Sequence, residues 1–525
     1  MDGGALPTWA LYAAALLASA AILRVLLASH RKERPPPPPG PRPWPIVGSL
    51  HLIGELPHRS IHELSRKYGP IMQLYLGSQR VVVGSSVEMA TEFLKKQDLV
   101  FASRPRTAAG KYTTYNYSDI AWAPYGPYWR QARRLCLTEL FSAKRLDSYE
   151  YIRLEETQRM LARLAGATTG GAAVLLKDHL NLLSLSVISR MTLGKTYIGE
   201  EAAMDVVSPE EFKKMLDEFF LLNGVFNIGD MIPWLDFLDL QGYVRRMKAL
   251  SVKFDAFLDR VLEEHEDRRG RAGPEFVPAD MVDVLLQLAD DPNLSVKLTR
   301  DGVKGFTQQK IYFWSAGHDR RGTETSAVTV EWAMAEILRR PEIFEKAWEE
   351  LDRVVGRERC VEEKDIPNLP FIESIVKETM RLHPAVPMLV PRYSREDTTV
   401  AGYHVPAGTE VLVNVWTIGR DPAVWDSPEE FRPERFEGRS VDVKGHDFEL
   451  LPFGAGRRMC PGYQLGLKMV QSSLANLLHG FRWRLPEGAA PEDLNMEELF
   501  GLTTPKKIPL EVVAELRLAS QVYSL

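Results

Sequence analysis

A ten-residue stretch near the C-terminal end, residues 453–462, carries the side chains best suited to chemistry. One cysteine, Cys460, stands in a loop that also holds Gly456, Arg458 and Gly462. Glycines permit tight turns that aim backbone N–H groups at a sulfur, and such donors with a nearby arginine favour the metal-binding thiolate. Since no second cysteine or histidine stands at zinc-finger spacing, the single thiolate suits the axial position of a haem.

The same stretch resembles the haem-binding signature of the cytochromes P450, with matches at Phe453, Gly456, Arg458, Cys460 and Gly462. The resemblance implies a mainly α-helical cytochrome P450 fold with a minor β-sheet, and a haem b cofactor whose iron is bound by the Cys460 sulfur. The glycines of the loop lack the spacing of a dinucleotide-binding fingerprint, so that alternative is excluded.

Other positions match family residues that bind the haem propionates. Trp129 and Arg133 are four residues apart, so they lie on one face of a helix, and Arg392 follows a proline. The resemblance therefore implies a cofactor-binding set made of Trp129, Arg133, Arg392, Phe453, Gly456, Arg458, Cys460 and Gly462.

A further match has a structural meaning in the family. Glu378 and Arg381 stand one helical turn apart, and Arg435 follows in a Pro-Glu-Arg-Phe sequence. In the family the matching residues form a buried ion network. The resemblance implies the same network here, supporting the haem pocket without taking part in the reaction.

The oxygen-activating motif of the family is matched only in part. Residues 322–326 fit it, with Thr325 as the hydroxyl donor to bound dioxygen and Glu324 as the group that delivers protons. Arg321, however, replaces the small residue that normally leaves room above the iron, and residues 309–321 are unlike the usual apolar approach.

Three interpretations of residues 309–321 follow. A splicing or gene-prediction error shifts the helix register, a true insertion bulges out and leaves Thr325 in place, or the change is adaptive. An unpaired Arg321 over the haem would be costly to desolvate. His318 offers a further alternative, because it could occupy the sixth position of the iron and block oxygen.

The N-terminal elements point to a membrane. Residues 6–28 are almost entirely apolar and about long enough to cross a bilayer. Arg24 lies near one end, and Arg31 and Arg34 follow, so the positive-inside rule places the rest of the chain in the cytosol. The sequence predicts a transmembrane anchor, with a cleaved signal peptide as the alternative.

A basic and proline-rich hinge at residues 29–48 follows, in which five consecutive prolines predict a stiff polyproline II segment. Microsomal members of the family have a similar hinge, which implies a single-pass protein of the endoplasmic reticulum membrane with a cytosolic catalytic domain. Residues 49–525 show no repeat and no shift in composition, so we expect a single haem-thiolate domain.

The periodicity of the body is mostly helical. Runs of β-forming residues around Gly77 and Ser78 predict a hairpin. Residues 263–278 are charged and contain glycine and proline, which predicts a solvated loop. Further helices are expected between Asp280 and His383. Before them, helices are predicted at residues 142–164, 175–193, 209–226 and 243–265.

Composition excludes other classes of protein. The net charge of −5 over 525 residues argues against nucleic acid as a partner, because phosphate binding needs a basic surface. Three cysteines, Cys136, Cys360 and Cys460, are too few for a disulfide scaffold.

The resemblance implies a monooxygenase that inserts one oxygen atom from O2 into a lipophilic small molecule. Electrons come from NADPH-cytochrome P450 reductase, for which Arg130 and Arg134 form a candidate docking face. The C-terminal residues 500–507 resemble plant microsomal members of the large specialised-metabolism (A-type) clan, which favours terpenoid-derived substrates, with flavonoids or other phenolics second. Alternatives are a catalytically impaired haem protein and a haem-thiolate isomerase or dehydratase.

The predicted substrate pocket rests on the same resemblance. Its residues are mostly apolar or aromatic, as a lipophilic ligand requires. They are Tyr112, Tyr115, Ile120, Leu221, Phe226, Val386, Leu389, Leu502 and Thr503.

Overall fold

A computed structural model describes residues 35–167, 171–196, 207–314 and 325–524. The predicted anchor at 6–28, and the predicted roles of His318, Arg321 and Glu324, lie outside the described residues. Within the four described segments, no helix combines the length and the apolar character needed to span a bilayer.

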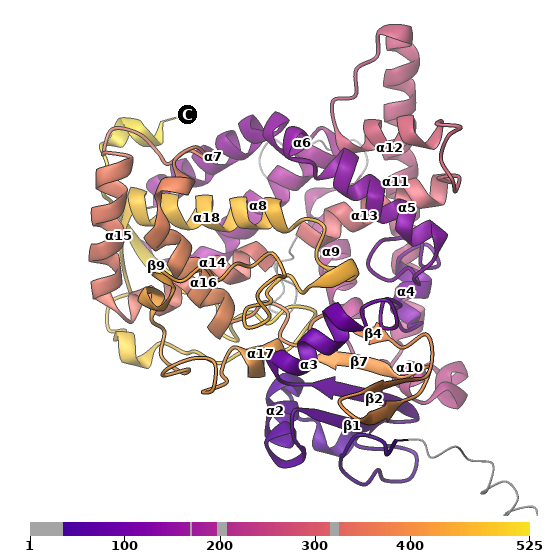
Figure 1. Ribbon diagram of the computed structural model, residues 1–525. Coiled ribbons are helices and arrows are strands. Elements are labelled where there is room, and N and C mark those ends of the chain that lie inside the picture. The colour runs from indigo at the N-terminus through magenta and orange to yellow at the C-terminus, as the bar shows by residue number, and fades with distance from the viewer. Residues whose placement is uncertain (1–34, 168–170, 197–206, 315–324, 525) are drawn as a thin grey trace, which may run out of the picture.

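The described chain is mainly helical, as predicted (Figure 1). The α-helices are α2 (Pro57–Tyr68), α3 (Val87–Thr91), α4 (Ala108–Thr113), α5 (Pro127–Leu135), α6 (Ala143–Ser148), α7 (Glu150–Ala167), α8 (Leu176–Leu193), α9 (Pro209–Gly224), α10 (Ile228–Met231), α11 (Tyr243–Ala272), α12 (Met281–Ala289), α13 (Arg300–Trp314), α14 (Thr325–Leu338), α15 (Pro341–Val354), α16 (Pro370–Leu382), α17 (Val415–Ile418) and α18 (Tyr463–Gly480).

Strands form small sheets at the side of the helices. One sheet has the strand order β1-β2-β7-β4, a second β3-β9-β8 and a third β5-β6. The strands are β1 (Ile71–Leu76), β2 (Gln79–Gly84), β3 (Val174–Leu175), β4 (Arg392–Tyr393), β5 (Thr398–Val400), β6 (Tyr403–Val405), β7 (Glu410–Val413), β8 (Phe481–Arg484) and β9 (Glu511–Leu516).

The predicted hairpin is confirmed as β1 and β2, which pair antiparallel from Ile71 with Gly84 to Leu76 with Gln79. Gly77 turns the chain with φ of +61°, and a Cβ there would lie 2.5 Å from the Met231 carbonyl oxygen. Only glycine fits this turn, because the left-handed backbone and the close approach both exclude a side chain. The turn therefore fixes the hairpin against the C-terminal end of α10.

The predicted helices correspond to α6 with α7, α8, α9 and α11, but the solvated loop predicted at 263–278 is wrong for residues 263–272, which belong to a helix. Helix α11 continues to Ala272 and ends only at Gly273, whose φ is +60°. The charged side chains of the last turns cover an exposed face, while His265 on the other face is buried and lies 3.0 Å from a carboxylate oxygen of Asp280. A charged composition did not reveal this buried contact between α11 and α12.

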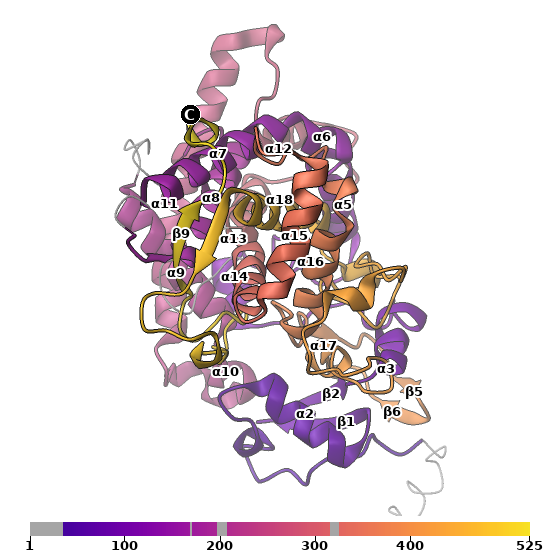
Figure 2. The same ribbon diagram turned by 90° about the vertical axis from the view of Figure 1, so that its left-hand side faces the viewer.

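Helices α14 and α18 form the centre of the helical body and pack against each other (Figures 1 and 2). Every residue of α14 from Ser326 to Leu338 is buried, which is the pattern of a helix enclosed on all sides. In Figure 2, β1, β2 and α2 lie below these helices. Residues 453–462 lead directly into α18, so the central pair places Thr325 and Cys460 in one region.

Candidate functional site

The start of α14, the start of α18, α5 and the segments around Ile120 and Leu389 enclose a large cavity. Its empty volume is about 1200 Å³, including solvent at its mouth. The lining residues are Arg104, Ile120, Ala121, Trp129, Arg133, Gln309, Thr325, Ser326, Thr329, Met380, Ala385, Val386, Leu389, Val390, Arg392, Pro452, Phe453, Gly454, Arg458, Met459, Cys460, Pro461, Gly466 and Val470.

Cys460 reaches this cavity from a closed loop. Its backbone N–H donates to the Phe453 carbonyl over 3.0 Å, and a short 3-10 turn at Gly456–Arg458 shapes the loop. Gly462 is the N-cap of α18, so the positive end of that helix dipole lies near the sulfur and favours a thiolate. No disulfide involves any of the three cysteines, all of which lie in the described chain.

Four arginines line the cavity: Arg104, Arg133, Arg392 and Arg458. Arg458 donates to the carbonyls of Ala102 (2.6 Å), Ile120 (3.1 Å) and Ala123 (2.6 Å). Arg104, which no sequence motif indicated, likewise donates to carbonyls, those of residues 121, 390 and 391. These contacts hold each guanidinium at the wall of the cavity.

The charge of the four arginines is poorly compensated. Burial, with repulsion from Arg392, lowers the pKa of Arg458 to about 9, and burial also lowers the pKa values of Arg104, Arg133 and Arg392. Among the described residues, only Arg392 of the four is ion-paired with a carboxylate, that of Asp98 at 2.8 Å. Buried cations without partners are unfavourable, so this cavity is suited to an anionic ligand.

Helix α5 connects the arginines to the cysteine loop. The Trp129 indole N–H donates to the Ile120 carbonyl over 3.0 Å, and the guanidinium of Arg458 lies 4.1 Å from the centre of the Trp129 ring. Arg133 donates to the Met459 carbonyl over 2.5 Å. The structure thus brings both predicted α5 residues to the cavity, beside Cys460.

The opposite wall is more polar than the sequence indicated. Thr325 is the first residue of α14, and its carbonyl accepts a hydrogen bond from the Thr329 hydroxyl over 2.7 Å. Gln309 of α13 accepts a hydrogen bond from the Ile120 backbone N–H over 2.8 Å. Glu324, predicted beside Thr325, lies outside the described residues.

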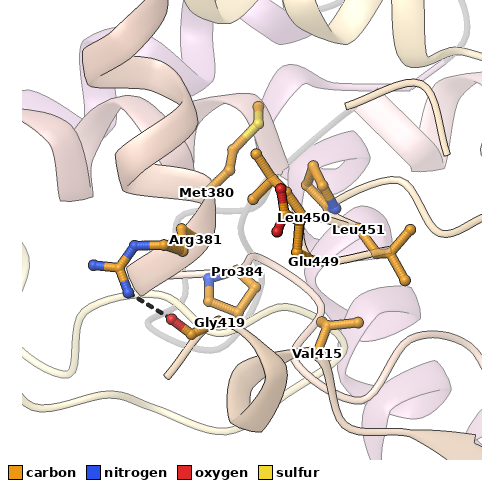
Figure 3. Close-up of a pocket in the computed structure, with 9 residues that line it drawn as sticks. Met380, Arg381, Pro384, Val415, Gly419, Glu449, Leu450 and Leu451 are labelled. Carbon is orange, nitrogen blue, oxygen red and sulfur yellow. Dashed lines mark hydrogen bonds between the residues drawn. The ribbon is translucent and has the colours of Figure 1, made fainter. Parts of the chain in front are cut away.

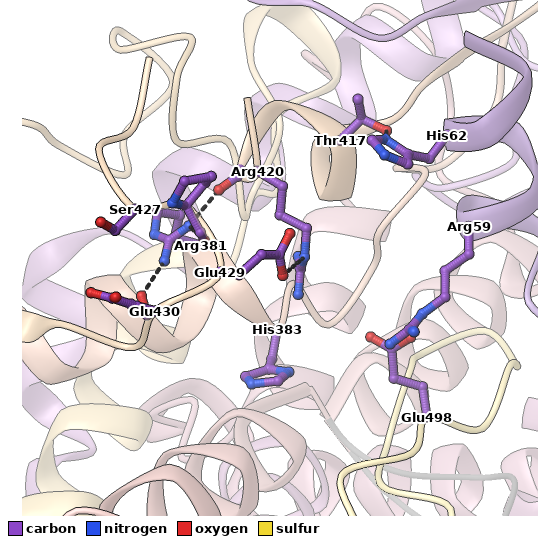
Figure 4. Close-up of polar contacts among 12 residues, drawn as sticks. Arg59, His62, Arg381, His383, Thr417, Arg420, Ser427, Glu429, Glu430 and Glu498 are labelled. Atoms are coloured by element: carbon purple, nitrogen blue, oxygen red, sulfur yellow. Dashed lines mark hydrogen bonds and ion pairs between the residues drawn. The ribbon is translucent and has the colours of Figure 1, made fainter. Parts of the chain in front are cut away.

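The predicted ion network lies next to the cavity rather than in it. Glu378 accepts two hydrogen bonds from Arg381, at 2.7 and 2.8 Å, and one from Arg435 at 2.9 Å. Arg381 also donates to the carbonyls of Gly419 and Glu430 (Figures 3 and 4). Met380 lines the cavity, so the network directly supports its wall.

The predicted substrate residues divide into two groups. Ile120, Val386 and Leu389 line the cavity. Phe226 is 43% exposed and stacks on Phe500 with ring centres 5.8 Å apart. The predicted residues that do not appear in the described lining are Tyr112, Tyr115, Leu221, Phe226, Leu502 and Thr503.

Two predicted glycines of the loop also lie outside the lining. Gly456 has φ of +68°, and a Cβ there would lie 2.2 Å from the Leu94 carbonyl oxygen, so its role is to let the loop approach η2 (Glu92–Lys96). Asp98, just after η2, was missed as well. Asp98 follows two lysines and a glutamine, and Arg104 stands between a serine and a proline, so neither has a periodic signal from which its burial can be predicted.

A buried cationic wall, an apolar cavity and one cysteine together define a haem-thiolate site. The thiolate suits the iron, and the uncompensated guanidiniums suit the two propionates of haem b.

The sequence matches the Cytochrome P450 family over residues 38–512. It is 50% identical to the trimethyltridecatetraene synthase of Zea mays over 533 residues, covering 97% of this chain and 94% of that protein. It is 44% identical to a flavonoid 3'-monooxygenase of Petunia hybrida, covering 92% and 93% of the two chains. A zebra fish cytochrome P450 solved with abiraterone superimposes with a TM-score of 0.71 and 27% identity, covering 88% of this chain and 100% of that one.

The chain therefore belongs to the cytochrome P450 family, among the plant members of its large specialised-metabolism clan. Its cofactor is haem b, and its reaction class is monooxygenation, as predicted.

Proposed function

We propose that this monooxygenase inserts one oxygen atom from O2 into a terpenoid-derived metabolite, with flavonoids as the second candidate class. The observation that carries the proposal is the apolar part of the cavity wall, which includes Ile120, Val386, Leu389 and Val390. Two relatives at 50% and 49% identity are named as synthases of branched, unsaturated hydrocarbons. Flavonoid 3'-monooxygenases at 43% and 44% identity support the second class.

Each predicted residue has a distinct part in this proposal. Cys460 binds the iron through Sγ, and Arg133, Arg392 and Arg458, joined by Arg104, hold the propionates. Bound in this way, haem supplies the oxygen-activating chemistry. Thr325 presents a hydroxyl proton to the cavity, and Glu324 is the predicted source of that proton.

The test is turnover with a purified plant reductase, NADPH and two substrate panels, one of acyclic terpenoids and one of flavonoids. Oxygenated terpenoid products that Cys460→Ser does not form support the proposal. Products from flavonoids alone would assign the second class. A thiolate-type carbon-monoxide band without any turnover would instead indicate the impaired protein that the abnormal residues 309–321 suggest.

The electron donor is proposed to be NADPH-cytochrome P450 reductase, docking on the Cys460 side. Arg130 and Arg134 of α5 are exposed there, and Arg130 and Arg395 both lie over the ring of Tyr125. Arg457, also exposed, extends the same basic surface. An acidic partner surface would be steered to it.

Charge reversal tests the docking surface. Arg130→Glu with Arg134→Glu is expected to slow reductase-supported turnover while peroxide-supported turnover stays unchanged. The matched control reverses Arg245 and Arg271, which are exposed on α11. Equal turnover of both double variants with reductase would contradict the docking surface.

We also propose the organisation of an anchor at 6–28, a hinge at 29–48 and a catalytic domain at 49–525, held at the endoplasmic reticulum membrane with the domain in the cytosol. The apolar surface near the start of the described chain supports this. Trp44 and Ile46 are exposed on one segment and Trp234 and Phe237 on another, Phe237 to 80%. The β1–β2 turn joins the two segments, because the N–H of Gly77 donates to the Val47 carbonyl and that of Ser78 to the Met231 carbonyl.

Deleting residues 1–34 tests this organisation. We expect the truncated chain to stay bound at high salt to vesicles that contain anionic lipid. The double substitution Trp234→Glu with Phe237→Glu is expected to release it. Release of the truncated chain without these substitutions would show that the apolar surface does not bind the membrane.

A further inference from the structure

The carboxylate of Asp98 lies beneath the cysteine loop, outside the cavity lining, with 4% of the residue exposed. It follows η2, a π-helical turn, and such turns occur often at functional sites. Both of its oxygens are used. Oδ1 accepts from the Arg392 guanidinium over 2.8 Å, and Oδ2 accepts from the backbone N–H and the guanidinium of Arg457 over 3.1 and 2.8 Å.

These contacts form a closed ring with the loop. Arg392 donates through its other terminal nitrogen to the Ala455 carbonyl over 2.7 Å. The ring therefore runs from Asp98 to Arg392, to the backbone at residues 455–457, and back to Asp98. Inside it, a Cβ on Gly456 would lie only 2.8 Å from Asp98 Oδ1, so the loop rests directly on the carboxylate.

We propose that Asp98 is a positioning residue for the haem iron. It fixes the cysteine loop relative to the cavity-lining Arg392, and it sets the electric field at the metal by balancing the arginine charge. This inference rests on haem binding through Cys460, as proposed above.

The expected change in the reduction potential follows from the charges of the arginines and carboxylates beside the cavity. Asp98 is the one carboxylate that the described residues pair with a cavity-lining arginine. Removing its charge leaves Arg392 and Arg457 uncompensated. Because added positive charge near a metal stabilises the reduced form, the reduction potential of the iron must rise.

The test measures the reduction potential and the ferrous carbon-monoxide spectrum of purified, haem-loaded, full-length variants, together with haem content per polypeptide. Asp98→Asn keeps the size of the side chain but removes the charge and turns one acceptor into a donor. We expect a positive shift of the potential and a larger fraction of the band that marks a lost thiolate. Asp352→Asn is the matched control. Asp352, on α15, also forms ion pairs with two arginines, Arg357 and Arg517.

Arg457→Gln separates charge from loop geometry. Its side chain is about half exposed and does not line the cavity, so we expect this variant to fold even where Asp98→Asn does not. Losing a positive charge should shift the potential in the negative direction, and the double variant should return toward the wild-type value. A purely structural role would loosen the loop in both variants and give no opposite signs.

Wild-type potential and spectrum in both single variants, with normal haem content, would overturn the proposal. Shifts of the same sign in both variants, or an equal shift in Asp352→Asn, would also overturn it. A wild-type protein without a thiolate-type band would refute haem binding through Cys460 itself, so the two failures are distinguishable.

Discussion

Arg458 and Trp129 share one acceptor. The guanidinium lies 4.1 Å from the centre of the indole ring, and both side chains donate to the Ile120 carbonyl, over 3.1 and 3.0 Å. Gln309 accepts from the N–H of the same residue over 2.8 Å. The backbone of Ile120 is therefore the point where α5, α13 and the cysteine loop meet.

Arg458→Lys is expected to lower haem affinity while keeping the charge. A lysine cannot donate to three carbonyls in the fixed geometry of a guanidinium, and we expect a loss of about 2 kcal/mol, or roughly 30-fold in affinity. Haem titration of the refolded variant measures it. Arg420→Lys is the matched control, because Arg420 is also buried, lies 3.9 Å from the centre of the Trp416 ring and is outside the cavity lining. Equal losses would contradict a specific role for Arg458.

Glu378→Gln is expected to destabilise the fold by about 3–5 kcal/mol, because it leaves the buried Arg381 and Arg435 without their carboxylate. The midpoint of urea unfolding measures the change. Glu373→Gln, on the same helix, breaks a partly exposed pair with Lys377 and should cost less than about 1 kcal/mol. A Glu378 variant as stable as the Glu373 variant would show that the network is not needed.

Gly456→Ala tests the close approach of the loop to η2. Gly456 and Gly438 have φ of +68° and +71°, so alanine strains the backbone at both by about 1–2 kcal/mol. Only at Gly456 would the new methyl group meet backbone, the Leu94 carbonyl oxygen. We expect Gly456→Ala alone to lose haem, measured as the Soret absorbance per polypeptide. Full haem content in that variant would mean that the loop can move away from η2.

Acid should weaken the contact between Glu498 and α2. Burial alone would raise the pKa of Glu498, but hydrogen bonds with His58 and Arg59 outweigh it and lower the pKa to about 2. Figure 4 shows Arg59 beside Glu498. Since the unfolded value is 4.5, the stabilisation is fully present above about pH 4.5 and is lost as the pH falls toward 2. The shift corresponds to about 3 kcal/mol.

Unfolding midpoints of the wild type and Glu498→Gln should therefore differ most at about pH 6, and the difference should shrink below about pH 4.5 and vanish only as the pH falls toward 2. The neighbouring Glu497→Gln is the control, since Glu497 pairs with Lys507 in an exposed position. A difference that stays constant over this range would exclude Glu498 as the titrating group.

The sequence predicted those parts of the molecule that have a local signal. The cysteine loop has a fixed spacing, the hairpin has turn residues, and α8 has helical periodicity. The end of α11 was missed because His265 is buried against Asp280 of a different element, which composition does not encode. Asp98 was missed for the same reason, since its partner Arg457 is 359 residues away. Contacts that form only on folding gave no pattern to recognise.

The four cavity arginines also bear on how the protein matures. Without an anionic ligand, four buried cations line one large cavity, and among the described residues only Arg392 of the four is ion-paired with a carboxylate. Haem binding and the final packing of the polypeptide are then coupled. We expect porphyrin supply in an expression host to limit the yield of folded chain, rather than only the coloured fraction of it.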